Sequence, residues 1–310
     1  MFGNKVLKGV LLVALGASSY GMLATFVKLA YSDVSSQGLH YTPAEVIVAQ
    51  FVIGILVVLL LNFFQKNRKK NQVVKASATD IKKLMLVGTS TGLTSIFYYL
   101  AVKYIPVSIG IVLLMQTVWM GVLLEAILEK KSPSKIKLFS VFIVLIGTLL
   151  ATNVIANTVT LDWRGIVLGL LAAASFTTTM FAANKVALSI SSLQRSLYML
   201  FGGIVVVFIF AFLTQKTPFN FDIFYRWGIL IALFGTIIPP ILLNSGFPHT
   251  GIGLGSIVAS LELPVSVTMA YFLLHEEVLF IQWFGILLIL TAIVIMNLNF
   301  KKNNISQLFS

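Results

Sequence analysis

Residues 46–65, VIVAQFVIGILVVLLLNFFQ, form a run of 20 residues that contains no Asp, Glu, Lys or Arg. A helix of about 20 apolar residues crosses the hydrocarbon core of a bilayer, which is roughly 30 Å thick. The apolar character of this run is continuous, whereas the strands of a membrane barrel alternate apolar and polar residues. The run therefore predicts one membrane-spanning helix.

Similar uncharged runs recur along the whole chain, at 9–27, 46–65, 84–102, 104–124, 138–161, 165–184, 196–215, 227–261 and 278–300. The run 227–261 is too long for one crossing, and it contains the pair Pro239 and Pro240. We therefore divide this region into spans near 223–245 and 249–274, which gives ten predicted spans in all.

The composition agrees with a chain that is embedded in lipid. Of its 310 residues, 58% are hydrophobic and only 10% are charged, and the mean hydropathy is +0.98. A soluble domain usually has about a quarter of its residues charged, because its surface faces water. We therefore expect an all-α integral membrane protein. The chain has no cysteine, which excludes disulfides and thiolate metal sites.

The net charge of +12 could indicate a nucleic-acid partner, but its distribution indicates membrane topology instead. With the N-terminus in the cytoplasm, 17 of the 22 Lys and Arg residues fall in cytoplasmic segments and 5 fall outside. Cytoplasmic loops of membrane proteins are enriched in these residues. We therefore predict a multi-pass protein with both termini in the cytoplasm, in a bacterial cell membrane, and no nucleic-acid partner.

The chain contains an internal repeat, which appears when the sequence is shifted by 145 residues. The shift places Ala101 on Gly246 and Gly110 on Gly255. Five helices per copy is an odd number, so the second copy enters the membrane from the opposite side. This inverted arrangement recurs in secondary transporters. We expect a first five-helix repeat at 1–153, a second at 154–300, and a cytoplasmic tail at 301–310.

Two stretches carry a resemblance to a known family. The first is YYLAVKYIPVSIGIVLLMQTVWMGVLLEAILEKKSPS (98–134), and the second is GIGLGSIVASLELPVSVTMAYFLLHEEVLFIQWFGILLILTAIV (251–294). They resemble the ends of the two repeats of an EamA-type, ten-helix drug/metabolite transporter. The resemblance implies a transporter of amino acids, metabolites or drugs, and no cofactor. The chain departs from the family pattern at Trp119, where the first repeat would have a proline.

Ionisable side chains inside a span are candidates for function, because at the bilayer centre they cost at least about 2.5–3.5 kcal/mol. Glu262 is predicted near the middle of a span, where it could carry a coupling proton, bind a substrate amine or serve as a structural polar group. Glu125 could act in transport, or it could simply reach neighbouring lysines or headgroups. Protons are therefore the candidate coupling ion.

Neutral polar and aromatic residues form a second set of candidates for a solute pathway, although each could equally serve helix packing. They are Ser19, Tyr20, Tyr99, Gln116, Trp119, Thr178 and Asn244. Proline removes a backbone donor and bends a helix, so Pro239, Pro240 and Pro264 are predicted kinks. The spacing of Gly88 and Gly92 predicts close contact between two helices.

These features favour a secondary active transporter, expected to be an exporter, which moves a small organic solute by alternating access. A passive facilitator or channel is the main alternative. An intramembrane enzyme is a weaker one, because the three histidines are scattered near helix ends and no metal-binding motif is present.

Overall fold

The computed structural model describes residues 2–68, 74–101, 103–105, 107–153 and 162–306, and it is almost entirely helical. Within these residues the structure contains no β-strand, only an isolated bridge between Val34 and His40. The helices are α1 (Phe2–Ser32), α2 (Pro43–Arg68), α3 (Ala78–Ala101), α4 (Val107–Leu114), α5 (Thr117–Glu129), α6 (Lys135–Ala151), α7 (Trp163–Lys185), α8 (Ser192–Thr214), η2 (Phe224–Gly228), α9 (Ile229–Ala232), η3 (Leu233–Ile237), α10 (Ile238–Ala259), α11 (Glu262–Leu274) and α12 (Phe280–Ser306).

Seven helical stretches in the described residues are long and apolar enough to cross a membrane, and the shorter apolar helix Phe280–Met296 accompanies them. One of the seven, Phe224–Leu274, has 51 residues. At 1.5 Å per residue it would be more than twice as long as a bilayer core is thick. The backbone leaves the helical region within it at Gly251, where φ is 74° and ψ is 174°. The stretch therefore consists of two helical segments.

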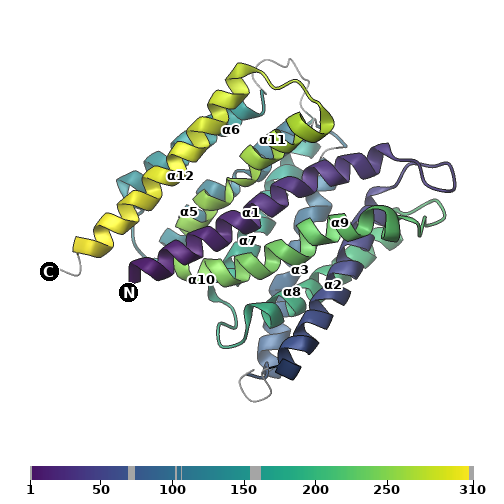
Figure 1. Cartoon of the computed structure of the whole chain (residues 1–310), viewed down its shortest axis with the longest axis horizontal. Coiled ribbons are helices and arrows are strands. Elements are labelled where there is room, and N and C mark those ends of the chain that lie inside the picture. The colour runs from purple at the N-terminus through teal and green to yellow at the C-terminus, as the bar shows by residue number, and fades with distance from the viewer. Residues whose placement is uncertain (1, 69–73, 102, 106, 154–161, 307–310) are drawn as a thin grey trace.

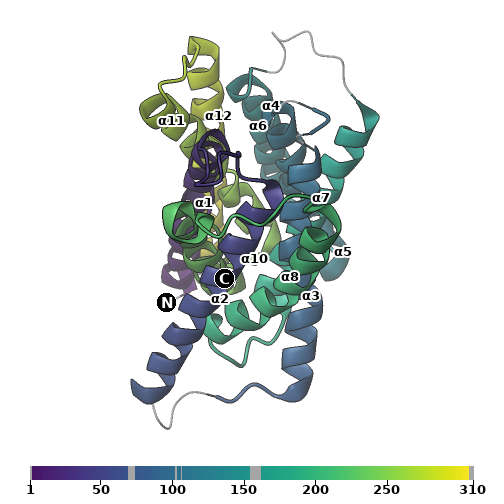
Figure 2. The same cartoon turned by 90° about the vertical axis from the view of Figure 1, so that its right-hand side faces the viewer.

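The helices pack side by side as a bundle. In the contacts between elements, α1 lies along α10 and α11, α3 lies along α7 and α8, and α6 lies along α12 (Figure 1). The paired helices α6 and α12 lie at one edge of the bundle in this view. A quarter turn shows α3, α7 and α8 on the side of the bundle away from α1 and α11 (Figure 2).

Small residues bring the helices close together, as predicted for Gly88 and Gly92. A Cβ atom on Gly88 would collide with the backbone of Met199, and one on Gly92 would collide with Gly203 and Val206 of α8. Helices in lipid associate mainly through such close packing. The glycine spacing on α3 therefore explains why α8 lies directly against it.

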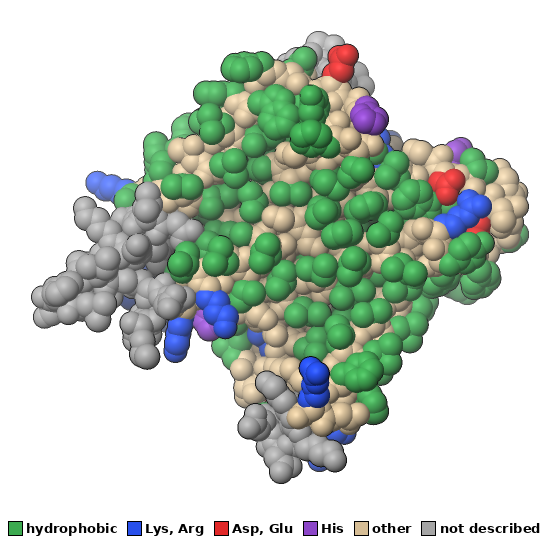
Figure 3. Space-filling model, viewed as in Figure 1, with side chains coloured by type: hydrophobic (Ala, Val, Ile, Leu, Met, Phe, Trp, Pro, Cys, Tyr) green, Lys and Arg blue, Asp and Glu red, His purple; other side chains and the backbone are tan. Residues whose placement is uncertain are grey.

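We call the two ends of the bundle the terminal end and the opposite end. The start of α1 and the end of α12 lie at the terminal end (Figure 1), where Gly9 of α1 packs against His249. At the opposite end Lys28 of α1 forms an ion pair with Glu276, in the connection between α11 and α12. Hydrophobic side chains cover the middle of the molecular face in Figure 3, and charged side chains lie toward its lower-left and upper-right edges. This distribution suits a protein whose waist is in lipid.

Two expectations about the helices are refined by the structure. The pair Pro239 and Pro240 does not break its helix, because the five-residue π-helix η3 leads directly into α10, where these prolines occupy the first positions. The predicted tail at 301–310 begins as a helix, since α12 continues to Ser306. The predicted boundary between the repeats adjoins residues 154–161, which lie outside the described part of the chain.

Candidate functional site

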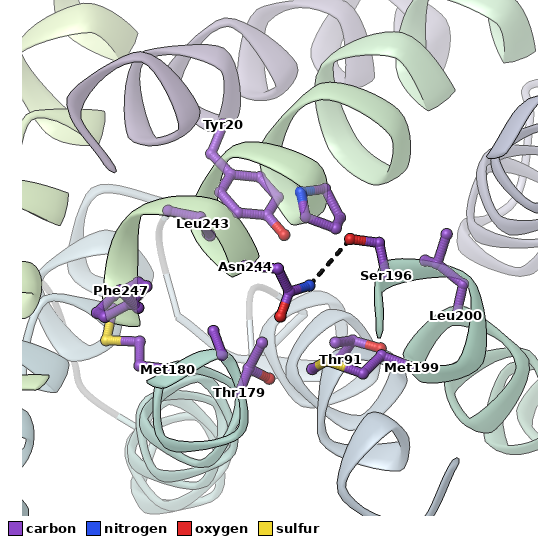
Figure 4. A pocket seen from close by; sticks show the side chains of 12 residues that line it. Tyr20, Thr91, Thr179, Met180, Ser196, Met199, Leu200, Leu243, Asn244 and Phe247 are labelled. Carbon is purple, nitrogen blue, oxygen red and sulfur yellow. Dashed lines mark hydrogen bonds between the residues drawn. The ribbon is translucent and has the colours of Figure 1, made fainter. Parts of the chain in front are cut away.

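A narrow internal pocket lies among five helices, α1, α3, α7, α8 and α10 (Figure 4). Its walls are mostly apolar with a few polar side chains. The lining residues are Tyr20, Thr91, Thr179, Met180, Ala183, Ser196, Met199, Leu200, Pro240, Leu243, Asn244 and Phe247. Small-molecule sites have such apolar walls with a few placed polar groups. The volume of this pocket is about 20 Å³, room for about one water molecule, so a solute could enter only if the helices moved apart. Two of the predicted candidates, Tyr20 and Asn244, lie in the pocket together with the kink residue Pro240.

Asn244 is the most informative polar residue of the pocket. Its side chain is 3% exposed, and its Nδ2 donates a hydrogen bond to Ser196 Oγ at 2.9 Å (Figure 4). Its Oδ1 has no hydrogen-bond partner among the described residues. A buried carbonyl oxygen without a donor costs about 1–3 kcal/mol. The pocket therefore presents an acceptor that a ligand could satisfy.

Arg195 bonds the backbone of the pocket residue Asn244, and sequence analysis did not identify it as a candidate. Its guanidinium is 2% exposed and has no acidic partner in the described chain. It donates instead to four backbone carbonyls, those of Ala182, Ala183, Val186 and Asn244, at 2.5–3.0 Å. The first three end α7, where the helix dipole favours a cation.

The carbonyl of Asn244 needs Arg195 for a specific reason. In an α-helix it would accept from the N–H four residues later, but residue 248 is a proline and has none. Arg195 Nη1 supplies the missing donor at 2.8 Å. Nearby, Asn184 Nδ2 donates to the carbonyl of Phe247 at 2.6 Å. The sequence signal that could have indicated this contact is a proline inside a predicted span, because it leaves the carbonyl four residues earlier without its usual donor.

Glu262 lies at an interruption between α10 and α11. The backbone there makes tighter i→i+3 hydrogen bonds, from Leu261 N to Val258 O at 3.1 Å and from Leu263 N to Ser260 O at 3.2 Å. The latter bond satisfies the carbonyl that Pro264 cannot reach. Glu262 is thus the first residue of α11, 11 residues after Gly251 and 12 before Leu274, close to the middle of its span.

The carboxylate of Glu262 has no partner within the described residues. It is partly buried, it forms no ion pair, and no group donates a hydrogen bond to it. It interacts electrostatically with the hydroxyls of Tyr20 and Tyr98. Because Tyr20 also lines the pocket, it connects the pocket to Glu262. The N-terminus of α11 is the one evident source of stabilisation for an ionised carboxylate there.

Glu125 has a different setting, at the terminal end. Its carboxylate pairs with Lys137 of α6, and its Oε1 accepts from Gly253 N at 3.0 Å, just after the turn at Gly251. Both members of the ion pair are about one-eighth exposed. These bonds fasten α5 and α6 to the turn, so Glu125 lies outside the pocket.

The remaining candidates also lie outside the pocket. Trp119 is 37% exposed, and its Nε1 donates to Gln116 Oε1 at 2.8 Å. Thr178 is exposed and bonds to the carbonyl of Ala174. Ser19 is buried and donates to Phe234 O at 3.4 Å. Tyr99 packs edge-on against Tyr31 and Tyr98, with ring centroids about 6 Å apart.

Polar contacts hold the opposite end together. Asp33 Oδ2 accepts from Trp227 Nε1 at 2.8 Å, and this bond holds the pKa of Asp33 below its ordinary value. Asp222 Oδ2 accepts from Ser36 N at 2.7 Å. Burial alone would raise the pKa of Asp222, but the bonds from Ser36 and the charge of Arg226 outweigh it and lower that pKa. Both carboxylates therefore stay ionised at neutral pH.

Comparisons with known proteins agree with this architecture of many spans around an internal pocket. One solved structure, described as a crystal structure of a protein, has 12% sequence identity and a TM-score of 0.75, and the match covers 95% of this chain and 98% of the other. At that identity the likeness concerns the fold alone. A search of curated proteins finds no significant match.

The family is established by sequence. The EamA-like transporter family matches residues 7–153 and, a second time, residues 163–298. The chain therefore belongs to the EamA-like transporter family, as its two quoted segments predicted. It is a multi-pass membrane protein from a family that generally transports small solutes.

Proposed function

We propose that this protein is a secondary active transporter that exports a small organic solute across a bacterial cell membrane by alternating access. One observation carries the proposal: the unpaired carboxylate of Glu262 lies near the middle of its span and acts on Tyr20 of the internal pocket. An ionisable group without a structural partner at that depth is costly. Binding of a coupling proton or of solute would offset this cost.

The proposed mechanism uses ten spans in two inverted repeats, 1–153 and 154–300. Two structural features that recur at the 145-residue shift support it. The interruption at Met115–Gln116 corresponds to that at Ser260–Leu261. The helices that follow, α5 and α11, both have 13 residues and end in left-handed residues with φ of 53°, Lys130 and His275.

The packing of the helices also supports a pseudo-twofold relation. If α1 corresponds to α7 and α3 to α10, the pair α1–α10 corresponds to α7–α3, and both pairs are in extensive contact. By the same relation α1–α11 corresponds to α7–α5, and these pairs are in contact as well. A fold of this kind has two equivalent arrangements of its halves around a central site.

We place the terminal end in the cytoplasm because Lys and Arg are concentrated there. In this assignment Arg195, Asn184 and the Glu125–Lys137 pair close the cytoplasmic side of the pocket. The Lys28–Glu276 pair and the Asp33–Trp227 bond join helices on the outer side. Export requires these two sets of contacts to break in turn.

Reconstituted vesicles test the proposal. We expect gradient-dependent accumulation of a transported solute, and we expect Glu262→Gln to abolish the response to a proton gradient. Glu129→Gln is the matched control, because Glu129 is exposed at the end of α5 and belongs to neither set of contacts. Flux that only equilibrates the solute, with or without the gradient, would identify a passive facilitator. Unchanged gradient-driven transport in Glu262→Gln would remove this residue from coupling.

A further inference from the structure

We propose that the solute is a protonated organic amine that keeps at least one N–H and carries an apolar body, and that its ammonium group binds beside Tyr20. This inference rests on the proposed transport function and specifies the chemistry of the same pocket. It follows from three properties of the described residues, namely charge, hydrogen-bonding capacity and wall chemistry.

The charge of the site favours a cation. Glu262 is an acid without a basic partner in the described chain, and none of the residues that line the pocket is Lys, Arg or His. The nearest buried cation, Arg195, already uses its guanidinium to bond four backbone carbonyls. An anionic solute would therefore meet an acidic group and no free positive charge, at a depth where charge is poorly screened.

The hydrogen-bonding capacity favours a solute with donors. Asn244 Oδ1 is a buried acceptor without a partner. Ser196 Oγ donates to the carbonyl of Ser192 and accepts from Asn244 Nδ2, so its hydrogen is already used. The hydroxyl of Thr91 likewise donates to Gly88 O. An N–H of the solute would satisfy Asn244 Oδ1, whereas a quaternary ammonium has no hydrogen to offer.

The walls suit an ammonium joined to a hydrocarbon. Tyr20 contributes an aromatic ring whose hydroxyl points toward the centre of the pocket (Figure 4), and it lies edge-on to Phe176, with ring centroids 5.8 Å apart. A cation is attracted to the face of such a ring. Met180, Met199 and Leu200 line the other side. Thioether side chains adapt to apolar groups of varied shape.

Four ligands on one skeleton separate these requirements: phenethylammonium, its N,N,N-trimethyl analogue, 2-phenylethanol and 3-phenylpropanoate. Binding to the purified full chain would be measured by thermal shift and by calorimetry. We expect phenethylammonium to bind about ten times more tightly than the trimethyl analogue, which has no N–H to donate to Asn244 Oδ1, and than the alcohol, which carries no charge. We expect no binding of the anion.

Two variants assign the preferences to residues. Glu262→Gln should remove the preference for amine over alcohol. Asn244→Leu should remove the preference for the primary amine over the trimethyl analogue and keep the preference for positive charge. Asn62→Leu is the matched control, because Asn62 bonds backbone carbonyls of Val58 and Leu193 outside the pocket and should change neither preference.

The outcomes also separate this inference from the proposed function. Equal or tighter binding of the alcohol, the anion or the trimethyl analogue overturns the inference. The inference is also overturned if none of the four ligands binds while vesicles accumulate a different class of solute. That result would leave the proposed transport function intact. Absence of concentrative transport for every solute tested, with amine binding retained, contradicts the transport function and leaves the ligand class standing.

Discussion

Arg195 and Glu262 are both ionisable, both lie within spans, and neither has an ion-pair partner in the described chain, yet their situations differ. Arg195 satisfies its donors with four backbone carbonyls, so its charge is compensated by dipoles. Glu262 accepts no hydrogen bond. Because all the hydrogen bonds of Arg195 are made within the protein, a structural role accounts for it. Glu262 lacks such hydrogen bonds, so we expect it to bind a ligand, a proton or both.

The sequence identified only one of these two residues. Glu262 was predicted because a carboxylate stands out in an apolar span. Arg195 begins α8 and was assigned to the cytoplasmic boundary with other basic residues. Its burial depends on three carbonyls at the end of α7 and on Pro248, which are brought together only by the packing of α7, α8 and α10.

At the residue scale we predict a pH response at the opposite end. Because the pKa of Asp33 is lower when folded than its ordinary 3.8, its bond to Trp227 stabilises the fold above that pH and is lost as pH falls below it. Tryptophan fluorescence should be constant from neutral pH to about pH 5 and should change below about pH 4. Asp33→Asn should abolish the change, and Asp162→Asn, at the start of α7, should retain it.

At the scale of elements, three helices depend on one side chain. Arg195 joins the end of α7, the start of α8 and the middle of α10, and it replaces the donor that Pro248 lacks. At Pro248, which was not a predicted kink, another element supplies the hydrogen bond, whereas the predicted kinks at Pro239 and Pro240 occupy the first positions of α10. Pro264 follows the same rule, since it stands in the first turn of α11.

We predict that Arg195→Met destabilises the folded protein by about 2–4 kcal/mol, because it leaves several buried carbonyls without a donor. Thermal unfolding in detergent would measure the change. Arg195→Lys should recover only part of the loss, since an ammonium cannot reach all four carbonyls. The exposed Arg68→Met is the control and should change stability by less than about 0.5 kcal/mol. Equal effects at both positions would contradict the role of Arg195.

A second prediction at this scale concerns the turn between the two segments of α10. Gly251 has φ of 74°, and a Cβ there would lie 2.7 Å from Glu125 Oε1. Gly251→Ala should therefore cost about 1–3 kcal/mol from backbone strain, and it should also disturb the bonds of Glu125. Gly38 has φ of 76° but open space around it. Gly38→Ala should consequently be milder in the same unfolding assay.

At the scale of the molecule, alternating access requires the pocket to open to each side in turn. The chain has no native cysteine, so a single introduced thiol reports directly on accessibility. Met199→Cys, in the pocket, should react with a membrane-impermeant thiol reagent added to either face of oriented vesicles. Phe212→Cys, on the 88% exposed surface of α8, should stay unreactive because it faces lipid. Reaction of Met199→Cys from one face only would contradict alternating access.

The sequence by itself determined that the chain is a helical membrane protein of the EamA-like family. Uncharged runs and their spacing are local properties, and the requirement that a backbone in lipid satisfy its own hydrogen bonds converts such runs into helices. Small residues such as Gly88 likewise indicated close packing.

Only the tertiary structure decided which polar residues meet in the pocket. Tyr20, Thr179, Ser196 and Asn244 come from four different helices, α1, α7, α8 and α10. Trp119 and Thr178 look equally suitable in the sequence but lie elsewhere. The face that a residue presents depends on how its helix is rotated against its neighbours. In a span that is apolar all round, the sequence has too little periodicity to specify that rotation.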